Sequence, residues 1–122
     1  MPAKKKPVTK KTLNKTKLVF GPNGGVKLTL DKRILVLETP GGRTIKMNDQ
    51  TASVEIDDGN GNVIKLAPAG ITIQAASKVR IDAAEIQVNA GTTKFSGTVQ
   101  CDALVSNSVI SASYSPGVGN IW

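Results

Sequence analysis

The sequence feature that most constrains the fold is a tandem series of short apolar pairs between Gly70 and Phe95. Each pair, such as Ile71 and Ile73, encloses one polar residue, which is the period-two alternation of a half-buried β-strand. The pairs recur every seven or eight residues, and a tandem repeat of this kind indicates a repeat architecture. One unit is too short to bury its own apolar side chains. The units must therefore stack on one another, within one chain or between chains.

The series extends in both directions, and its spacing shrinks toward the C-terminus. The first members of the pairs are residues 35, 45, 54, 64, 71, 79, 86, 93 and 99, and the gaps between them are 10, 9, 10, 7, 8, 7, 7 and 6 residues. The residues between pairs also become smaller, from the polar run at 57–62 to the alanine pairs at 75–76 and 83–84. We therefore expect an all-β fibre that tapers toward its C-terminal end.

A small β-sandwich of eight or nine short strands is the alternative fold, because strand spacings of roughly 8–12 residues also suit a sandwich. The 122-residue chain has only four aromatic residues, which are few to fill the space of ~10 Å between two packed sheets. The taper and the scarcity of aromatic residues favour the slender repeat fold.

The net charge of +7 lies entirely in the first 17 residues, which contain seven lysines and no acidic residue. The other nine Lys and Arg residues balance the nine Asp and Glu residues. A basic polar tail of this kind is either solvated or docked on an acidic partner. The lysines expected to attach the chain to such a partner are Lys4, Lys5, Lys6, Lys10, Lys11, Lys15 and Lys17.

The chain lacks the residues that most catalytic sites need. It has no histidine, so a Ser-His-Asp or Cys-His system is excluded. Its one cysteine, Cys101, reads as a small buried hydrophobe. The run from Asp58 to Asn62 resembles the start of a calcium loop, but Val63 and Ala69 stand where that loop needs Gly and Glu. We expect no enzymatic activity, no metal and no cofactor.

Targeting signals are also missing from the sequence. The lysine run is followed by Pro7 and Thr9 and not by an apolar stretch, so no signal-peptide pattern appears. No apolar run approaches the ~18 residues of a transmembrane helix. We expect the chain to be made in the cytoplasm and to leave the cell, if it does, by another route.

Residues 33–112 resemble the β-helical C-terminal part of contractile-tail spike proteins, the phage baseplate V-type spikes and the valine-glycine repeat spikes of type VI secretion. The resemblance is carried by the Thr39-Pro40-Gly41-Gly42 turn, the Asp57-Asp58-Gly59 stretch, the run from Gly61 to Leu66, and Gly70-Ile71-Thr72-Ile73 followed by short Ile and Val strands. Proteins of this family form an intertwined homotrimeric β-helix that crowns the tail tube and pierces the target envelope.

The resemblance implies a homotrimeric, triple-stranded β-helix, a tapering β-prism that acts as the central spike of a contractile tail or injection system. We expect a basic tail at 1–17, β-helix repeats at 18–112 and a tip segment at 113–122. Assembly would take place in the baseplate of a virion or of a secreted contractile particle. The residues expected in the trimer core are Ile64, Leu66, Ile71, Ile73, Val79, Ile81, Ile86, Val88, Phe95, Val99 and Cys101.

Two departures from the family pattern concern the ends of the spike. We expect no oligosaccharide-binding-fold hub segment of the kind that usually precedes the β-helix. Attachment to a hub protein of the tail or tube would then use the lysine tail or be achieved by another chain. The His-x-His iron site of some spike tips is also absent, because the sequence has no histidine. We expect the tip to be closed by a capping protein or by a segment that includes Tyr114, Pro116 and Trp122.

Two other functions compete with the spike. A bactofilin-like β-solenoid scaffold would polymerise end to end into filaments, which requires similar cross-sections at both ends. The shrinking gaps favour a spike, with a wide base, a narrow tip and a transient contact with the target membrane. A nucleic-acid-binding module that works through the tail lysines is the third hypothesis, and nucleic acid is not the expected partner.

Overall fold

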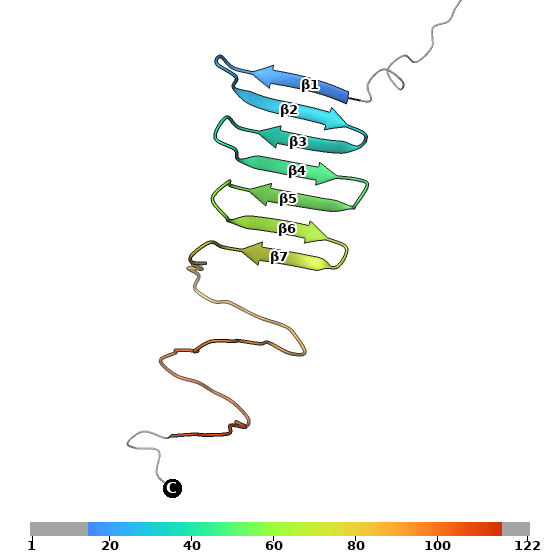
Figure 1. Ribbon diagram of the computed structural model, residues 1–122. Helices are drawn as coiled ribbons and strands as arrows, with labels where there is room; N and C mark the ends of the chain where they lie inside the picture. The colour runs from blue at the N-terminus through green and yellow to red at the C-terminus, as the bar shows by residue number, and fades with distance from the viewer. Residues whose placement is uncertain (1–14, 116–122) are drawn as a thin grey trace, which may run out of the picture. The chain divides into compact units, whose positions relative to one another are not determined.

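The computed structural model describes residues 15–115 of the chain, and these contain β-strands and no helix. The chain divides between Asp82 and Ala83 into two compact units. The first unit holds one antiparallel sheet (Figure 1). Its seven strands are β1 (Lys15–Phe20), β2 (Val26–Asp31), β3 (Ile34–Glu38), β4 (Thr44–Asn48), β5 (Ser53–Asp57), β6 (Val63–Ala67) and β7 (Gly70–Gln74).

The sheet is a meander in which every strand pairs with the next one along the chain. The connections are short, as expected when neighbouring antiparallel strands are joined directly. Strands β2 and β3 are linked by Lys32 and Arg33, whose φ angles of 48° and 67° match the type I′ turn that suits the twist of a hairpin. In the longer loop between β1 and β2, a Cβ at Gly25 would lie 1.9 Å from the carbonyl oxygen of Phe20, so only glycine fits there.

The strand register sorts the side chains onto two faces. Cross-strand partners such as Leu37 and Ile45, or Ile56 and Ile64, bring apolar residues of successive strands side by side. Because side chains alternate along a strand, all of these residues lie on one side of the sheet. We call this side the apolar face: Leu18, Phe20, Val26, Leu28, Leu30, Leu35, Leu37, Ile45, Met47, Val54, Ile56, Ile64, Leu66, Ile71 and Ile73.

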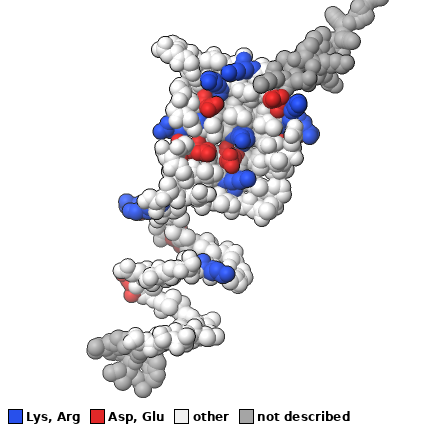
Figure 2. All heavy atoms as spheres, in the orientation of Figure 1, with Lys and Arg blue, Asp and Glu red and all other residues white. Residues whose placement is uncertain are grey.

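The opposite side, which we call the polar face, carries mostly charged, amide and hydroxyl side chains, together with Val19, Ile34, Val36 and Val63. Lys46, Glu55 and Lys65 are consecutive cross-strand partners at its centre, with Thr72 next in line on β7. Figure 2 shows basic and acidic side chains gathered together over the sheet. Alternating opposite charges on neighbouring strands are favourable pairs. This face can therefore remain exposed to solvent.

Among the described residues, no hydrophobic side chain of the single chain is buried. The apolar face has nothing packed against it, and Ile71 and Ile73 on β7 are 69% and 64% exposed. A sheet gains its stability by covering its apolar face with another layer, and exposed apolar surfaces of this extent mark interaction sites. The fold of one chain thus leaves its apolar face uncovered.

The second unit, described over residues 83–115, contains no strand. Its chain runs in extended segments between bends at 84, 91, 96–97, 102, 107 and 112–113. The bends lie seven residues apart between Ala84 and Gly91 but five apart between Asp102 and Asn107. The spacing between bends therefore falls once, at Gly91, and stays near five residues from there to the end of the described chain.

Two expectations from the sequence need revision, and a third stays a prediction. The first strand begins at Lys15 and not at Leu18, so the last lysines of the basic segment belong to the sheet. Strand pairing within the chain ends at Gln74, and the β-helix repeats expected as far as residue 112 stay a prediction, because one chain does not show pairing between chains. The alternative β-sandwich is wrong for the described chain, because its strands form one sheet and not two.

Candidate functional site

The candidate site is the apolar face itself, since it is the part of the sheet that the single chain leaves uncovered. Four of the residues predicted for a core, Ile64, Leu66, Ile71 and Ile73, lie on this face in β6 and β7. The apolar face also includes residues that are not on the predicted list, and it extends back to Leu18 on β1. Alternation at Val26, Leu28 and Leu30 in the sequence is the signal that identifies this part of the face.

The other predicted core residues follow the last strand and lie in extended segments without strand partners in their own chain. Val79 lines a recess together with Ile56, Ile64 and Ile73 of the apolar face. The remaining ones are all exposed in the single chain: Ile81, Ile86, Val88, Phe95, Val99 and Cys101. Their place in a core is not tested by one chain, and it stays a prediction.

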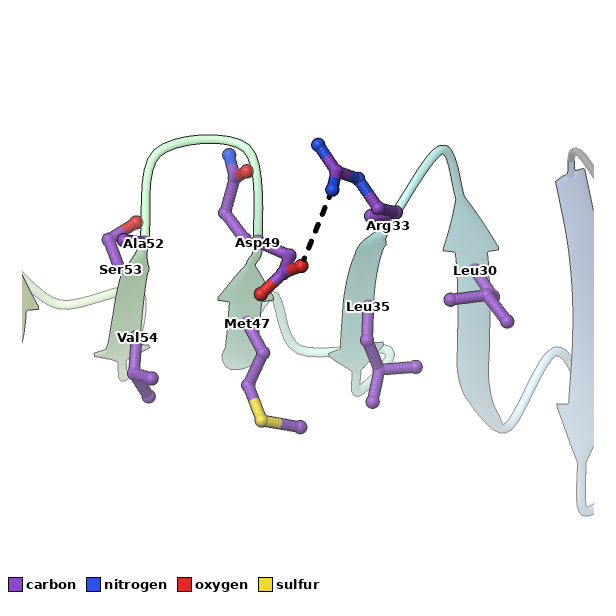
Figure 3. A pocket seen from close by; sticks show the side chains of 9 residues that line it. Leu30, Arg33, Leu35, Met47, Asp49, Ala52, Ser53 and Val54 are labelled. Carbon is purple, nitrogen blue, oxygen red and sulfur yellow. Dashed lines mark ion pairs between the residues drawn. The ribbon is translucent and has the colours of Figure 1, made fainter.

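One end of the apolar face is hollowed beneath the turns that join β2 to β3 and β4 to β5. Figure 3 shows Leu30, Leu35, Met47 and Val54 pointing to the same side from four strands. At the turns above them an exposed ion pair joins the Arg33 guanidinium to the Asp49 carboxylate, with 3.8 Å between the atoms. The lining is mainly aliphatic, so the hollow fits apolar side chains better than a polar substrate.

The opposite end of the sheet is organised by the loop between β5 and β6. The Asp58 carboxylate accepts hydrogen bonds from the backbone N–H groups of Asn60 and Asn62, at 2.8 and 3.1 Å. It also accepts from the side-chain amides of the same two residues, at 3.3 and 2.7 Å. The Asn62 Oδ1 atom accepts a hydrogen bond of 2.8 Å from the backbone N–H of Ala76. The loop thus holds the chain just beyond the end of β7.

Hydrogen bonding to the charged form lowers the pKa of the Asp58 carboxyl to about 2, with the Asn62 amide as the largest cause. The ordinary value is 3.8, so the folded state binds this proton less tightly than the unfolded state. The loop's contribution to stability is therefore complete above about pH 4 and is lost as the pH falls through about 2.

We expect the unfolding temperature of the native protein to fall between pH 4 and pH 2, and an Asp58→Asn variant to lose part of that fall. The neutral amide cannot change its charge, so it removes this titration while it keeps a similar shape. Thermal unfolding followed by circular dichroism across this pH range measures the difference. An unchanged pH dependence in the variant would show that other carboxyl groups cause the fall.

Most of the residues predicted for the two ends lie outside the described part of the chain. Lys15 begins β1, and Lys17 lies on its polar face. Tyr114 is exposed near the end of the described residues. The residues outside the description are Lys4, Lys5, Lys6, Lys10, Lys11, Pro116 and Trp122.

Residues 15–115 contain no group of three or more Cys, Asp or Glu side chains arranged to hold a metal ion. Over the same range, the structure contains no helix with the length and apolarity to cross a membrane.

The comparisons with known proteins point to one family. No curated protein matches the sequence. Residues 34–94, which are half of the chain, match the phage baseplate V C-terminal trimerisation domain. The matched region runs from the first residue of β3 through β7 and into the extended segments of the second unit. The chain therefore belongs to the family of the phage baseplate V C-terminal trimerisation domain.

Proposed function

We propose that three copies of this chain pack their apolar faces around a common axis and form a rigid spike at the end of a contractile tail. The observation that carries the proposal is the seven-stranded sheet with one continuous apolar face and no buried hydrophobic side chain among the described residues. Fully covering each Leu or Ile of this face contributes roughly 1.5–3 kcal/mol. Three sheets related by a threefold axis would supply that cover to each other.

The length and shape of such an assembly would allow it to penetrate a membrane. Each strand adds ~4.8 Å along the stacking direction, so the seven strands of the sheet span about 30 Å, which is close to the hydrocarbon thickness of a bilayer. Beyond the sheet, the distance between bends falls from seven residues to five. If three chains wind around one axis there, the cross-section narrows toward the C-terminal end.

The spike would act mechanically and not as an enzyme. In this proposal the N-terminal lysines attach it to an acidic hub protein of the tail or tube, and the narrow end meets the target membrane, with or without a capping protein. The spike would be made in the cytoplasm and assembled into the baseplate of a phage or a related particle. The baseplate family supports this role, whereas no observation favours a filament-forming scaffold.

The test is the mass of the purified protein in solution. We expect a stable trimer of about 38 kDa, three times the mass of the 12.7 kDa chain, by light scattering at micromolar concentration. A monomer would leave the apolar face exposed and would contradict the proposal. Polydisperse filaments that sediment at low speed would instead favour the scaffold.

A further inference from the structure

The bends of the second unit divide its chain into short extended segments, and the third residue of each segment forms one row. In the order of the chain this row consists of Gln87, Lys94, Gln100, Val105 and Ile110. Its first three members are polar, like Lys65 and Thr72 between the apolar pairs of the sheet. The last two members are aliphatic. The row therefore changes from polar to apolar in the last two segments, 103–106 and 108–111.

Val105 and Ile110 lie on the side of their segments that the chain leaves open. They are 97% and 98% exposed, whereas the residues before them, Leu104 and Val109, are 73% and 62% exposed. Neighbouring side chains of an extended segment point to opposite sides. Leu104 and Val109 thus lie on the side that their own chain partly covers. Val105 and Ile110 lie on the other side.

The second residue of each segment shows which side would face a common axis. This position is held by Ile86 and Val99 in two earlier segments, and both are expected in the trimer core. Leu104 and Val109 hold the same position in the last two segments. If they continue the core, Val105 and Ile110 face outward around the narrow end of the proposed spike.

No charged side chain accompanies these outward residues. Between Ala103 and Ser115, where the description ends, the chain contains no Lys, Arg, Asp or Glu. The last described segments are accordingly white in Figure 2. Charged side chains are costly to move into hydrocarbon, whereas the rim of a protein–protein interface is polar. The composition of this stretch therefore fits lipid better than a protein partner.

The serines of the same segments use their hydroxyl groups within the chain. The Ser106 hydroxyl donates a hydrogen bond of 2.6 Å to the carbonyl oxygen of Ser108, and the Ser111 hydroxyl donates one of 2.5 Å to that of Ser113. Removing a hydroxyl from water is costly when it has no hydrogen-bond partner. These two donors keep their partners without water, which lowers the cost of surrounding the segments with lipid.

We propose that Val105 and Ile110 form an apolar collar, two side chains from each of three copies, which partitions into the hydrocarbon of a lipid bilayer. The inference rests on the proposed trimer, because backbone groups that enter lipid must be hydrogen-bonded and these segments have no strand partner in one chain. It adds to the proposed function an affinity for membranes that needs no contraction force. Exposed apolar patches commonly mark such sites.

Flotation with lipid vesicles tests the collar. The full-length protein is mixed with phosphatidylcholine vesicles, which carry no net charge, in concentrated salt that screens the N-terminal lysines. Part of the protein should float with the vesicles in a density gradient. Vesicles that contain phosphatidylglycerol provide a second arm. Binding to these anionic vesicles alone, and only at low salt, would assign the attraction to the lysines and overturn the collar.

Two double variants locate the contact. Val105→Gln with Ile110→Gln gives the last two positions the polar side chain of Gln87 and Gln100, and it should lower the partition coefficient at least about tenfold, since burial of these side chains drives binding. Val19→Gln with Val63→Gln makes the same change on the polar face of the sheet. This control should bind vesicles like the native protein. Light scattering should show a trimer for both.

A fluorescent label shows which part of the chain enters the lipid. A polarity-sensitive fluorophore is attached through Asn107→Cys, at the bend between the two collar segments, in a Cys101→Ser background. Its emission should shift to shorter wavelength when phosphatidylcholine vesicles are added. The same label attached through Lys27→Cys, on the polar face of β2, should show no shift. A shift at Lys27 and none at Asn107 would overturn the collar.

The remaining outcomes separate the collar from the proposed trimer. A native trimer that does not float with either kind of vesicle would overturn the collar and leave the trimer intact. Unchanged flotation of the Val105→Gln, Ile110→Gln variant would also overturn it. Dissociation of that variant into single chains would show that the two side chains face the axis. A native monomer would instead remove the proposed function on which the collar rests.

Discussion

An Ile73→Asp variant is expected to dissociate the proposed trimer into single chains. Ile73 lies on the apolar face of β7, beside Ile64 of β6, and is 64% exposed in one chain. In a lone sheet the new carboxylate would remain largely in water and would cost little. In the trimer, threefold symmetry buries three carboxylates around one axis, with a penalty of several kcal/mol for each buried ion even after relaxation. Light scattering at micromolar concentration should show a monomer.

The neighbouring residue provides the control. Thr72 lies on the polar face of the same strand, with Lys65 as its cross-strand partner. Thr72→Asp introduces the same charge one residue away, next to a cation and in contact with water, so the trimer should persist. If Ile73→Asp remained trimeric while Thr72→Asp dissociated, the polar face would be the one that packs between copies.

If the protein is the proposed spike, removal of residues 1–14 is expected to abolish its incorporation into particles without affecting its trimerisation. This segment contains five of the seven N-terminal lysines. The other two, Lys15 and Lys17, belong to β1, so the deletion stops before the sheet begins. Attraction between a basic segment and an acidic hub is electrostatic and should weaken with added salt. The number of spikes per purified particle, measured by quantitative mass spectrometry, gives the loss.

Two charge variants separate electrostatic attachment from recognition of particular side chains. Replacing the five lysines by glutamine should reproduce the deletion, whereas replacing them by arginine keeps every positive charge and should preserve incorporation. Normal incorporation of the glutamine variant would show that the lysines do not attach the spike. Loss of the trimer on deletion would show that residues 1–14 belong to the fold.

The strands of the sheet could be predicted from the sequence because their pattern is local. A residue pair such as Leu35 and Leu37, or Ile45 and Met47, identifies a strand and the side of it that is buried. The turns at Thr39-Pro40-Gly41-Gly42 and at Asp57 to Asn62 mark where each strand ends. In an antiparallel meander with short turns, these two facts also define the register. The pairing of Leu35 with Met47 follows directly.

The first strand was partly missed because its pattern is weak. Thr16 takes a position on the apolar side, opposite Leu30, while the lysines at 15 and 17 resemble the polar segment before them. What identifies this strand is its partner, since Lys15 and Lys17 pair with Asp31 and Thr29 of β2. Pairing of this kind is a tertiary contact and cannot be read from composition.

The alternation at Ile71 and Ile73 is the same as that at Val79 and Ile81, so the sequence alone specifies two strands and one apolar side for each. It does not specify that the chain stops pairing with itself between them. At this point of the folded chain the Ala76 backbone N–H donates a hydrogen bond to the Asn62 side chain, which lies 14 residues earlier in the chain. Period-two patterning specifies which side of a strand becomes buried, because the preference for burial is a property of each apolar side chain. The strand that pairs with each segment depends on the path of the chain in the folded protein. Only the tertiary structure provides that path.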